Sequence, residues 1–193
     1  MTEGVVEVRG PVGNHLGSRM SGGEIRLTDG AGDFAGAEMS GGLIWIQGSV
    51  GDFLGANYDG GQLGQTGGVI RVDGSAGSDV GRAMRRGLIA IRGRVTLRCG
   101  LVMRAGTILV GDEAGPGMGQ EMVRGTILLG KAPSDLADRF RYGSTQSLPA
   151  ADLILRFIEK LGMKDHGMGQ RWRLFHGDML QGGRGEVFIS DAS

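Results

Sequence analysis

Arginine is the residue type with the strongest chemical signal in this chain. Between Val80 and Gly111 there are seven arginines and no aspartate or glutamate. These arginines are Arg82, Arg85, Arg86, Arg92, Arg94, Arg98 and Arg104. Guanidinium groups bind carboxylates and phosphates, and like charges held close together need compensation. Three interpretations stay open: a solvated face neutralised by ordinary neighbours, a docking face for an acidic protein partner, and a binding site for an anionic small molecule.

Other reactive residue types show no catalytic pattern. A single cysteine allows no internal disulfide and no cysteine-based metal cluster, and the three histidines have no ligand spacing. The glycine string from Asp29 to Ala37 imitates a dinucleotide-binding fingerprint, but a related string follows one unit later and no helix follows either string. We therefore predict no catalytic residue and no metal site.

Composition restricts the class of protein. Glycine accounts for 40 of 193 residues, against about 7% in ordinary proteins. The hydrophobic fraction of 40% is too high for a disordered glycine-rich linker, and 21 basic residues against 21 acidic ones disfavour a general nucleic-acid binder. We find no signal peptide and no apolar run near 18 residues, so the expectation is a cytoplasmic protein that has no membrane contact.

The glycines begin the units of an internal repeat. Five of the six spacings between unit starts are 19 residues, and the sixth is 26, which places a seven-residue insertion between Tyr58 and Gly68. The unit starts are Gly4, Gly23, Gly42, Gly68, Gly87, Gly106 and Gly125. Repeats of this length are typical of solenoid proteins, in which each unit buries the apolar side of the next.

Counting each start glycine as zero, the apolar residues align in columns. Columns two and four are aliphatic in every unit, which predicts a short strand with one buried face. Columns eight, twelve and sixteen are also apolar, and column thirteen is always glycine. Column sixteen contains Met20, Met39, Tyr58, Met84, Met103 and Met122. The fold prediction is all-β: a right-handed parallel β-helix of about six to seven coils over residues 1–130, with the methionines and Cys99 in its core.

The same columns bring separate arginines together. Arg85 and Arg104 share column seventeen on adjacent coils, and Arg86 and Arg124 share column eighteen two coils apart. With Arg82, these four arginines form the candidate site for an anionic ligand or a partner.

Residues 131–193 lack the period and are predicted to be a short α+β appendix. We expect a short helix over 132–143 capped by Ser134, then an amphipathic helix over 148–162 with Pro149 in its first turn. The expected apolar face of that helix is Leu153, Ile154, Phe157, Ile158 and Leu161. The stretches "RWRLFHGD" and "GEVFIS" are predicted strands around the turn "QGGRG". This appendix should pack along the rod or cap its C-terminal end, because an open coil exposes strand edges and core.

The order of these stretches resembles a known family. The succession "MSGGEIRL", "MSGGLIWIQG", "GGVIRVDGSAG", "MRRGLIAIRG", "MRAGTILVG" and "MVRGTILLG", followed by "FHGDMLQGGRGEVFI", is similar to the C-type subunits of formylmethanofuran dehydrogenase and of the bacterial formyltransferase/hydrolase complex. A related glycine-rich β-helix forms the C-terminal domain of glutamate synthase. Family members usually carry a segment before the first coil, so the cap of that coil is not predicted.

The resemblance implies a non-catalytic component in a complex of one-carbon metabolism. Such complexes move formyl groups between tetrahydromethanopterin, a methanofuran-type carrier and formate. The implied partners are A-, B- and D-type subunits, with zinc in the A-type subunit and no cofactor bound by this chain. The carrier has a glutamate-rich tail, which the candidate arginines are predicted to hold. The alternative is a stand-alone β-helix enzyme or binding module that acts on polysaccharide or another anionic ligand, although aromatic residues, at 5%, are scarce for that role.

Overall fold

One short parallel strand forms at the start of each repeat unit. The structure is a computed structural model, and it describes residues 1–136, 139–163 and 168–191. Alternation of aliphatic residues favours a strand at each start, and the glycine-rich turns that follow end it. The seven strands are β1 (Val5–Val8), β2 (Ser21–Leu27), β3 (Gly41–Ile46), β4 (Val69–Val72), β5 (Leu88–Ile91), β6 (Thr107–Val110) and β7 (Gly125–Leu129).

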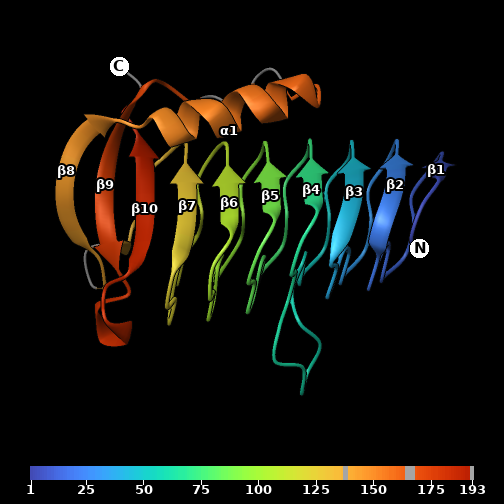
Figure 1. Ribbon diagram of the computed structural model, residues 1–193, viewed down its shortest axis with the longest axis horizontal. Coiled ribbons are helices and arrows are strands. Elements are labelled where there is room, and N and C mark those ends of the chain that lie inside the picture. Colours follow the sequence, from blue (N-terminus) through green and yellow to red (C-terminus); the bar gives the residue numbers. More distant parts are fainter. Residues whose placement is uncertain (137–138, 164–167, 192–193) are drawn as a thin grey trace.

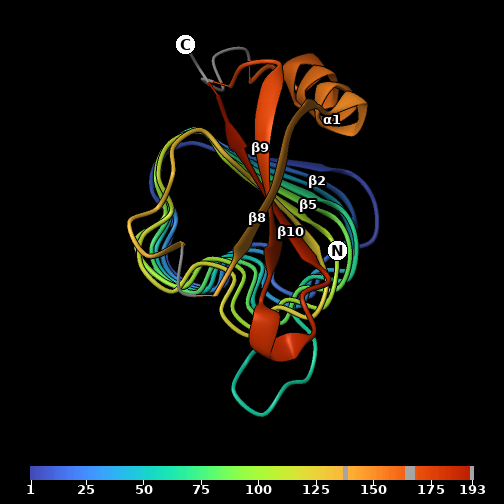
Figure 2. The ribbon, with the colours of Figure 1, turned by 90° about the vertical axis from the view of Figure 1, so that its left-hand side faces the viewer.

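These strands stack side by side into a rod, with one coil between each strand and the next (Figure 1). Pairing follows the sequence columns, so Ile44 of β3 pairs with Ile70 of β4 despite the seven-residue insertion. A second line of parallel bridges runs through column eight, from Val12 to Ala114. Seen from the C-terminal end, the chain winds counterclockwise as it advances toward the viewer, which makes the coil right-handed (Figure 2). The predicted parallel β-helix is confirmed.

The apolar columns fill the interior of the rod. Ile44, Ile70, Met84 and Cys99 are fully buried in one continuous cluster. Column thirteen is always glycine for a steric reason that Gly81 illustrates. Its φ is +65°, and a Cβ there would lie 2.6 Å from Cδ1 of Ile108, two units further on. Any larger residue would therefore meet both backbone strain and a clash with the core.

One column assignment is wrong. Tyr58 is expected in the methionine column, but the structure places the fully buried Gln65 there. Gln65 lies beneath Gly87, the start glycine two units further on, as Met84 lies beneath Gly106. The reason is the insertion: residues between Asn57 and Gln65 loop outward, so the residue three positions before Gly68 enters the core. Tyr58 lies outside it.

The last strands extend the same sheet. β10 (Gly185–Ser190) pairs parallel with β7 and keeps the column register, with Val187 opposite Ile127. β9 (Arg171–Gly177) and β8 (Arg141–Ser147) then add antiparallel at the edge, so the order is β1-β2-β3-β4-β5-β6-β7-β10-β9-β8. The two predicted strands around "QGGRG" are confirmed.

The C-terminal opening of the coil is closed by Phe140. A Cβ on Gly119 would lie 2.6 Å from the Phe140 ring, as a Cβ on Gly81 would strike Ile108. Phe140 therefore takes the place that an isoleucine of a further coil would occupy. It is buried together with Leu136 against the rod core.

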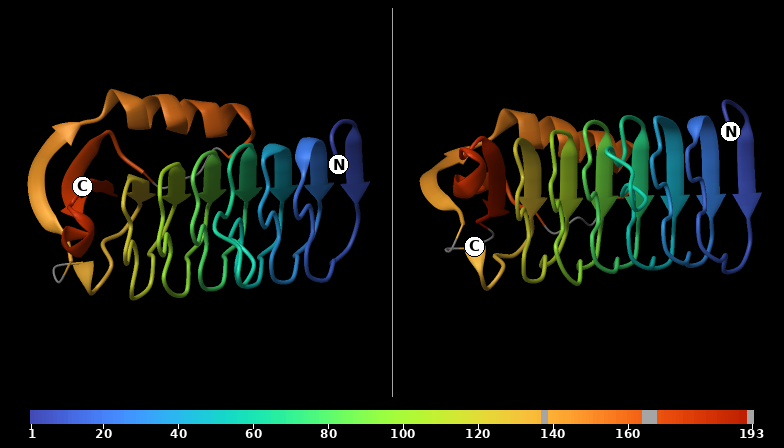
Figure 3. Two further views of the ribbon diagram at one scale, coloured as in Figure 1. Left: turned by 60° about the horizontal axis from the view of Figure 1, so that its bottom comes forward. Right: turned by 90° about the horizontal axis from the view of Figure 1, so that it is seen from below.

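Helix α1 (Pro149–Lys160) covers the outer face of the last coils (Figure 3). Column three points outward. It carries Arg26 and Trp45 in the early coils but Ala90, Leu109 and Leu128 under the helix, where all three are buried. Burial of each large aliphatic side chain contributes about 2 kcal/mol, which holds α1 on the sheet.

The helix is correctly predicted, but its buried face only in part: Ile158 is buried and Ile154 packs against the same cluster, as expected. Ala151, Leu155 and Ile158 are buried, whereas Leu153 is 71% exposed and Phe157 is 43% exposed. Both sides of α1 carry apolar residues, and the small Ala151 allows close approach to the sheet. The predicted short helix over 132–143 is also wrong in part, because Arg141–Gly143 belong to β8; residues 137–138 lie outside the described residues.

In the described part of the chain, no helix has both the length and the apolar character needed to cross a bilayer.

Candidate functional site

Four of the five candidate arginines line one surface hollow of about 400 Å³. Arg85 and Arg86 precede β5, Arg104 precedes β6 and Arg124 precedes β7, and Val123 and Ala105 complete the walls. Each of these arginines follows a buried column-sixteen methionine by one or two residues, so the turn that places the methionine inside directs the next side chains outward. Column positions therefore predicted this juxtaposition correctly.

The four guanidinium groups are uncompensated within the described residues. All four side chains belong to exposed residues, and none forms an ion pair or a hydrogen bond with another described side chain. None of the described carboxylates lines the hollow. Like charges on adjacent coils repel, and an anion placed among them would be attracted by all four. The hollow is thus suited to carboxylate or phosphate groups.

Arg82, the fifth candidate, lies in an adjoining hollow with the inserted loop. It donates from Nε to Asn57 Oδ1 at 2.8 Å, pairs with Asp59 at 3.1 Å and lies over the Phe53 ring. That hollow, also about 400 Å³, shares Arg104 with the first. The two hollows therefore form one continuous basic surface, in which Arg82 is already partnered.

Two other arginines of the run are neutralised by neighbours. Arg98 makes a two-point ion pair with the buried carboxylate of Asp79, at 2.7 and 2.8 Å. The hydrogen bond and the charge of Asp79 raise the pKa of Arg98 further. Arg92 lies 3.7 Å from Asp73. The interpretation of a neutralised face thus fits these residues, whereas it does not fit the four around the hollow.

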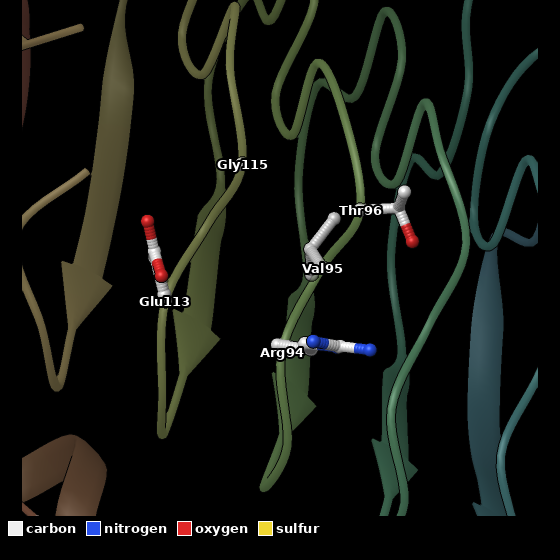
Figure 4. Close-up of a pocket in the computed structure, with 5 residues that line it drawn as sticks. All are labelled: Arg94, Val95, Thr96, Glu113 and Gly115. Carbon is white, nitrogen blue, oxygen red and sulfur yellow. The ribbon is translucent and has the colours of Figure 1, made fainter. Parts of the chain in front are cut away.

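A separate hollow of about 290 Å³ lies between two coils and is lined by Arg94, Val95, Thr96, Glu113 and Gly115 (Figure 4). Thr96 stands in column nine, where most other units have glycine. Arg94 and Glu113 come from adjacent coils, and Figure 4 shows the Arg94 side chain directed away from Glu113. This hollow therefore lacks the concentrated single-sign charge of the arginine hollow.

The inserted loop is fixed to the first coils by Tyr58. Its hydroxyl lies 2.8 Å from His15 Nδ1 and 2.6 Å from Ser18 Oγ. Its ring stacks on Phe34 with centroids 5.1 Å apart, and Phe34 stacks on Phe53 at 4.6 Å. His15, Phe34 and Phe53 all stand in column eleven, a regularity that sequence reasoning missed. The stack thus holds the inserted loop, whose Asn57 and Asp59 line the hollow that contains Arg82.

The loop between β9 and β10 contains the short 3-10 helix η2 (Met179–Gln181). In Figures 1 and 2 the inserted loop and this loop project from the same side of the rod, the first below the base of β4 and the second below β9 and β10. The arginines of the hollow precede β5, β6 and β7, so they lie between these two projections.

Buried Asp178 anchors the η2 loop. Its carboxylate accepts hydrogen bonds from the backbone N–H groups of Glu121 and Leu180, both at 2.9 Å, and from Arg139 at 3.1 Å. Burial alone would raise the pKa of Asp178, but these three donors together lower it below the ordinary value. This aspartate stands in the stretch "FHGDMLQGGRGEVFI", but no role was predicted for it from the sequence.

Reactive groups elsewhere are used for packing. Cys99 is buried in the rod core, and burial raises the pKa of its thiol to about 12, so a thiolate nucleophile does not form near neutral pH. Among the residues that the structure describes, no group of three or more His, Cys, Asp or Glu side chains is placed to hold a metal ion.

A glycine-rich parallel β-helix with a C-terminal α+β cap and an external basic hollow defines a solenoid protein whose distinctive surface is suited to binding. Comparison with known proteins identifies the family within this class. No protein-family model matches the chain, and no curated protein matches it in sequence. A solved structure does match: a chain of the formyltransferase/hydrolase complex (FhcABCD) from Methylorubrum extorquens, determined in complex with methylofuran.

The two chains are 31% identical, with a TM-score of 0.85, and the match covers 97% of this chain and 71% of that one. The chain belongs to the family of this β-helical component of the formyltransferase/hydrolase complex. The family expected from the repeat and the terminal "GDMLQGGRGE" is thereby confirmed.

Proposed function

We propose that this chain is the C-type subunit of a formyltransferase/hydrolase complex, where it acts as a structural and docking component. The single observation that carries the proposal is the near full-length match to a chain of such a complex solved with methylofuran. The complex would move formyl groups between tetrahydromethanopterin, a methanofuran-type carrier and formate. Partner subunits of the A, B and D types would perform the chemistry, with zinc in the A-type subunit.

The non-catalytic part of the proposal rests on how reactive groups are used. The thiol of Cys99 is buried, and Asp79 and Asp73 are held in ion pairs with arginines. The concentrated chemical feature of the arginine hollow is positive charge, and positive charge by itself binds and orients rather than transferring a formyl group.

The arginine hollow is proposed to hold the acidic tail of the carrier. Arg85, Arg86, Arg104 and Arg124 can each donate two N–H groups to one carboxylate, and their spacing over three coils suits a chain of several carboxylates. Because the groups are exposed, each pair would contribute little alone and would weaken with salt, so affinity would come from their number.

Purification of the tagged chain from its native host tests the proposed role in the complex. We expect A-, B- and D-type subunits to co-purify in fixed ratio. A chain that purifies alone and is active alone would contradict the proposal. It would favour the alternative of a stand-alone enzyme or binding module.

Charge reversal tests the role of the hollow separately. The triple variant Arg85→Glu, Arg86→Glu, Arg104→Glu should weaken binding of a methanofuran-type carrier at least tenfold while the complex still assembles. Arg94→Glu is the matched control, because it changes an exposed arginine of the same run in a different hollow. Loss of assembly in the triple variant would identify a docking face instead, and no effect on either measurement would identify a merely solvated surface.

A further inference from the structure

The η2 loop presents two large apolar side chains to solvent. Leu180 is 77% exposed and Met179 is 44% exposed, although both follow the fully buried Asp178 directly. Exposure of a leucine side chain to water is unfavourable for an apolar group. An exposed apolar cluster surrounded by polar residues is typical of a protein interface.

This loop is held in one shape by many bonds. Besides the three bonds to the Asp178 carboxylate, the Asp178 carbonyl accepts from the N–H groups of Gln181 and Gly183, and Met179 N–H donates to the Arg139 carbonyl. Gly182 and Gly183 both have positive φ, which lets the chain turn back toward β10. A pre-shaped loop loses little conformational entropy on binding, so its exposed side chains can act as anchors.

The loop is anchored to the chain segment that leads into the arginine hollow. Asp178 binds the N–H of Glu121, and two residues later the exposed Val123 lines the hollow beside Arg124. Arg184, on the other side of the loop, is also exposed, while the carboxylates nearest to it in the chain and to Arg124 are those of Glu186 and the exposed Glu121. The apolar tip therefore stands beside the concentrated positive charge of the arginine hollow, with Arg184 as a further exposed cation.

We propose that the loop from Asp178 to Arg184 is a docking knob for a protein partner in the complex that offers an apolar pocket with carboxylates at its rim. Met179 and Leu180 would fill the pocket, and Arg124 and Arg184 would meet the rim. Charge complementarity selects this occupant over a second copy of the chain, because two such knobs would repel each other. The inference rests on the proposed function and assigns one contact within it. A partner docked here would lie next to the arginine hollow.

Leu180→Asp tests the knob, with Leu153→Asp as its matched control. Both leucines are highly exposed, at 77% and 71%, but Leu153 lies on α1, away from the loop. The chain is co-expressed with the other subunits of the complex, and the apparent Kd for the partner is measured by titration of the tagged chain. We expect Leu180→Asp to weaken association at least tenfold and Leu153→Asp to leave it within twofold, with unchanged melting temperatures for both isolated chains.

Several results would overturn the inference. Wild-type affinity in Leu180→Asp, or an equal loss in Leu153→Asp, would each do so. If Leu180→Asp lowers the melting temperature, Leu180→Ser is measured in its place, and it must show the same selective loss. Binding of the wild-type chain to vesicles of anionic phosphatidylglycerol, lost in Leu180→Asp while assembly persists, would assign the tip to a membrane surface instead. A wild-type chain that associates with no other component of the complex would refute the proposed function itself.

Discussion

The guanidinium of Arg71 forms a two-point ion pair with the carboxylate of Asp73, both bonds being 2.8 Å long. Arg71 is only 3% exposed, and its remaining nitrogen donates to the carbonyl of Leu161 at the end of α1. Its other face lies 4.2 Å from the centre of the Trp45 ring, whose Nε1 donates to Asp73. Arg71 thus joins β4 to the C-terminal end of the helix.

Arg71→Leu should destabilise the fold by about 3 kcal/mol, because it leaves the carboxylate of Asp73 partly buried and poorly paired. Urea unfolding measures the loss in the free energy of unfolding. Relative to the wild type, amide hydrogen exchange should accelerate more in α1 than in β2 and β3. Arg92→Leu is the control: Arg92 approaches the same carboxylate at 3.7 Å but is 39% exposed, so we expect a loss below about 1 kcal/mol. Equal losses in the two variants would contradict the role given to Arg71.

Gln65→Met should change stability by less than about 1 kcal/mol, because Gln65 fills the position that methionine fills in the other coils. The variant loses two bonds from Nε2, to the carbonyls of Gly67 and Gly68, but also removes a buried Oε1 that has no partner. Gln65→Ala leaves a cavity and should cost about 2 kcal/mol or more. Denaturant unfolding of the wild type and the two variants gives the comparison. A Gln65→Met variant less stable than Gln65→Ala would refute the placement of Gln65 in the methionine column.

Tyr58→Phe should cost about 1 kcal/mol, since it removes the hydroxyl that contacts His15 and Ser18 and keeps the ring stack. Tyr58→Ala removes the stack with Phe34 as well and should cost about 2 to 3 kcal/mol. The free energy of unfolding is read from urea titration, and protease cleavage within residues 57–66 reports the loop itself. Cleavage rates that are equal in all three proteins would mean that Tyr58 does not hold the loop.

Asp178 should make stability depend on acid pH. Its folded-state pKa is below the ordinary value, so its ionised form contributes stability above that value, and the contribution is lost as pH falls through the lowered pKa. Asp178→Asn should therefore be less stable than the wild type by about 2 kcal/mol at pH 7, and the difference should shrink as pH falls below about 4.

Asp191→Asn serves as the control for acid unfolding, because Asp191 is exposed and its nearest basic atom, on Arg173, lies 3.6 Å away. We expect it to differ from the wild type by less than about 0.5 kcal/mol at every pH. A wild-type to Asp178→Asn difference that stays constant with pH would show that the carboxylate acts through shape and not through charge.

The repeat made most of the fold predictable. Strand pairing between coils follows directly from a 19-residue period, so Val12, Ile44 and Met84 could be placed before folding was considered. The unit with the insertion was the exception, because its column positions can be counted forward from its own start glycine or back from the next one, and the two counts disagree. Counting back three residues from each start glycine gives Met20, Met39, Gln65 and Met84, and this count identifies Gln65 correctly. Counting forward from Gly42 selected Tyr58, since it ignores where the chain leaves the coil.

The buried face of α1 was less predictable, because hydrophobic periodicity alone cannot choose between two apolar sides. Leu153 and Phe157 are more hydrophobic than Ala151, yet Ala151 faces the sheet. A signal for the covered surface existed in column three, which changes from Arg71 to Ala90 and Leu109 where the helix lies. Packing between the outer face of the strands and the helix made the choice.

The sequence by itself determined the coil, its period, its core columns and the clustering of Arg85, Arg86, Arg104 and Arg124, because neighbours on adjacent coils are related by a constant number of residues. Only the tertiary structure decided which arginines stay unpaired, how Asp178 fixes the η2 loop beside them, and how Arg71 holds α1. Those contacts join residues between about 40 and 90 positions apart, with no repeating separation, so they arise when the coil and its C-terminal strands pack together.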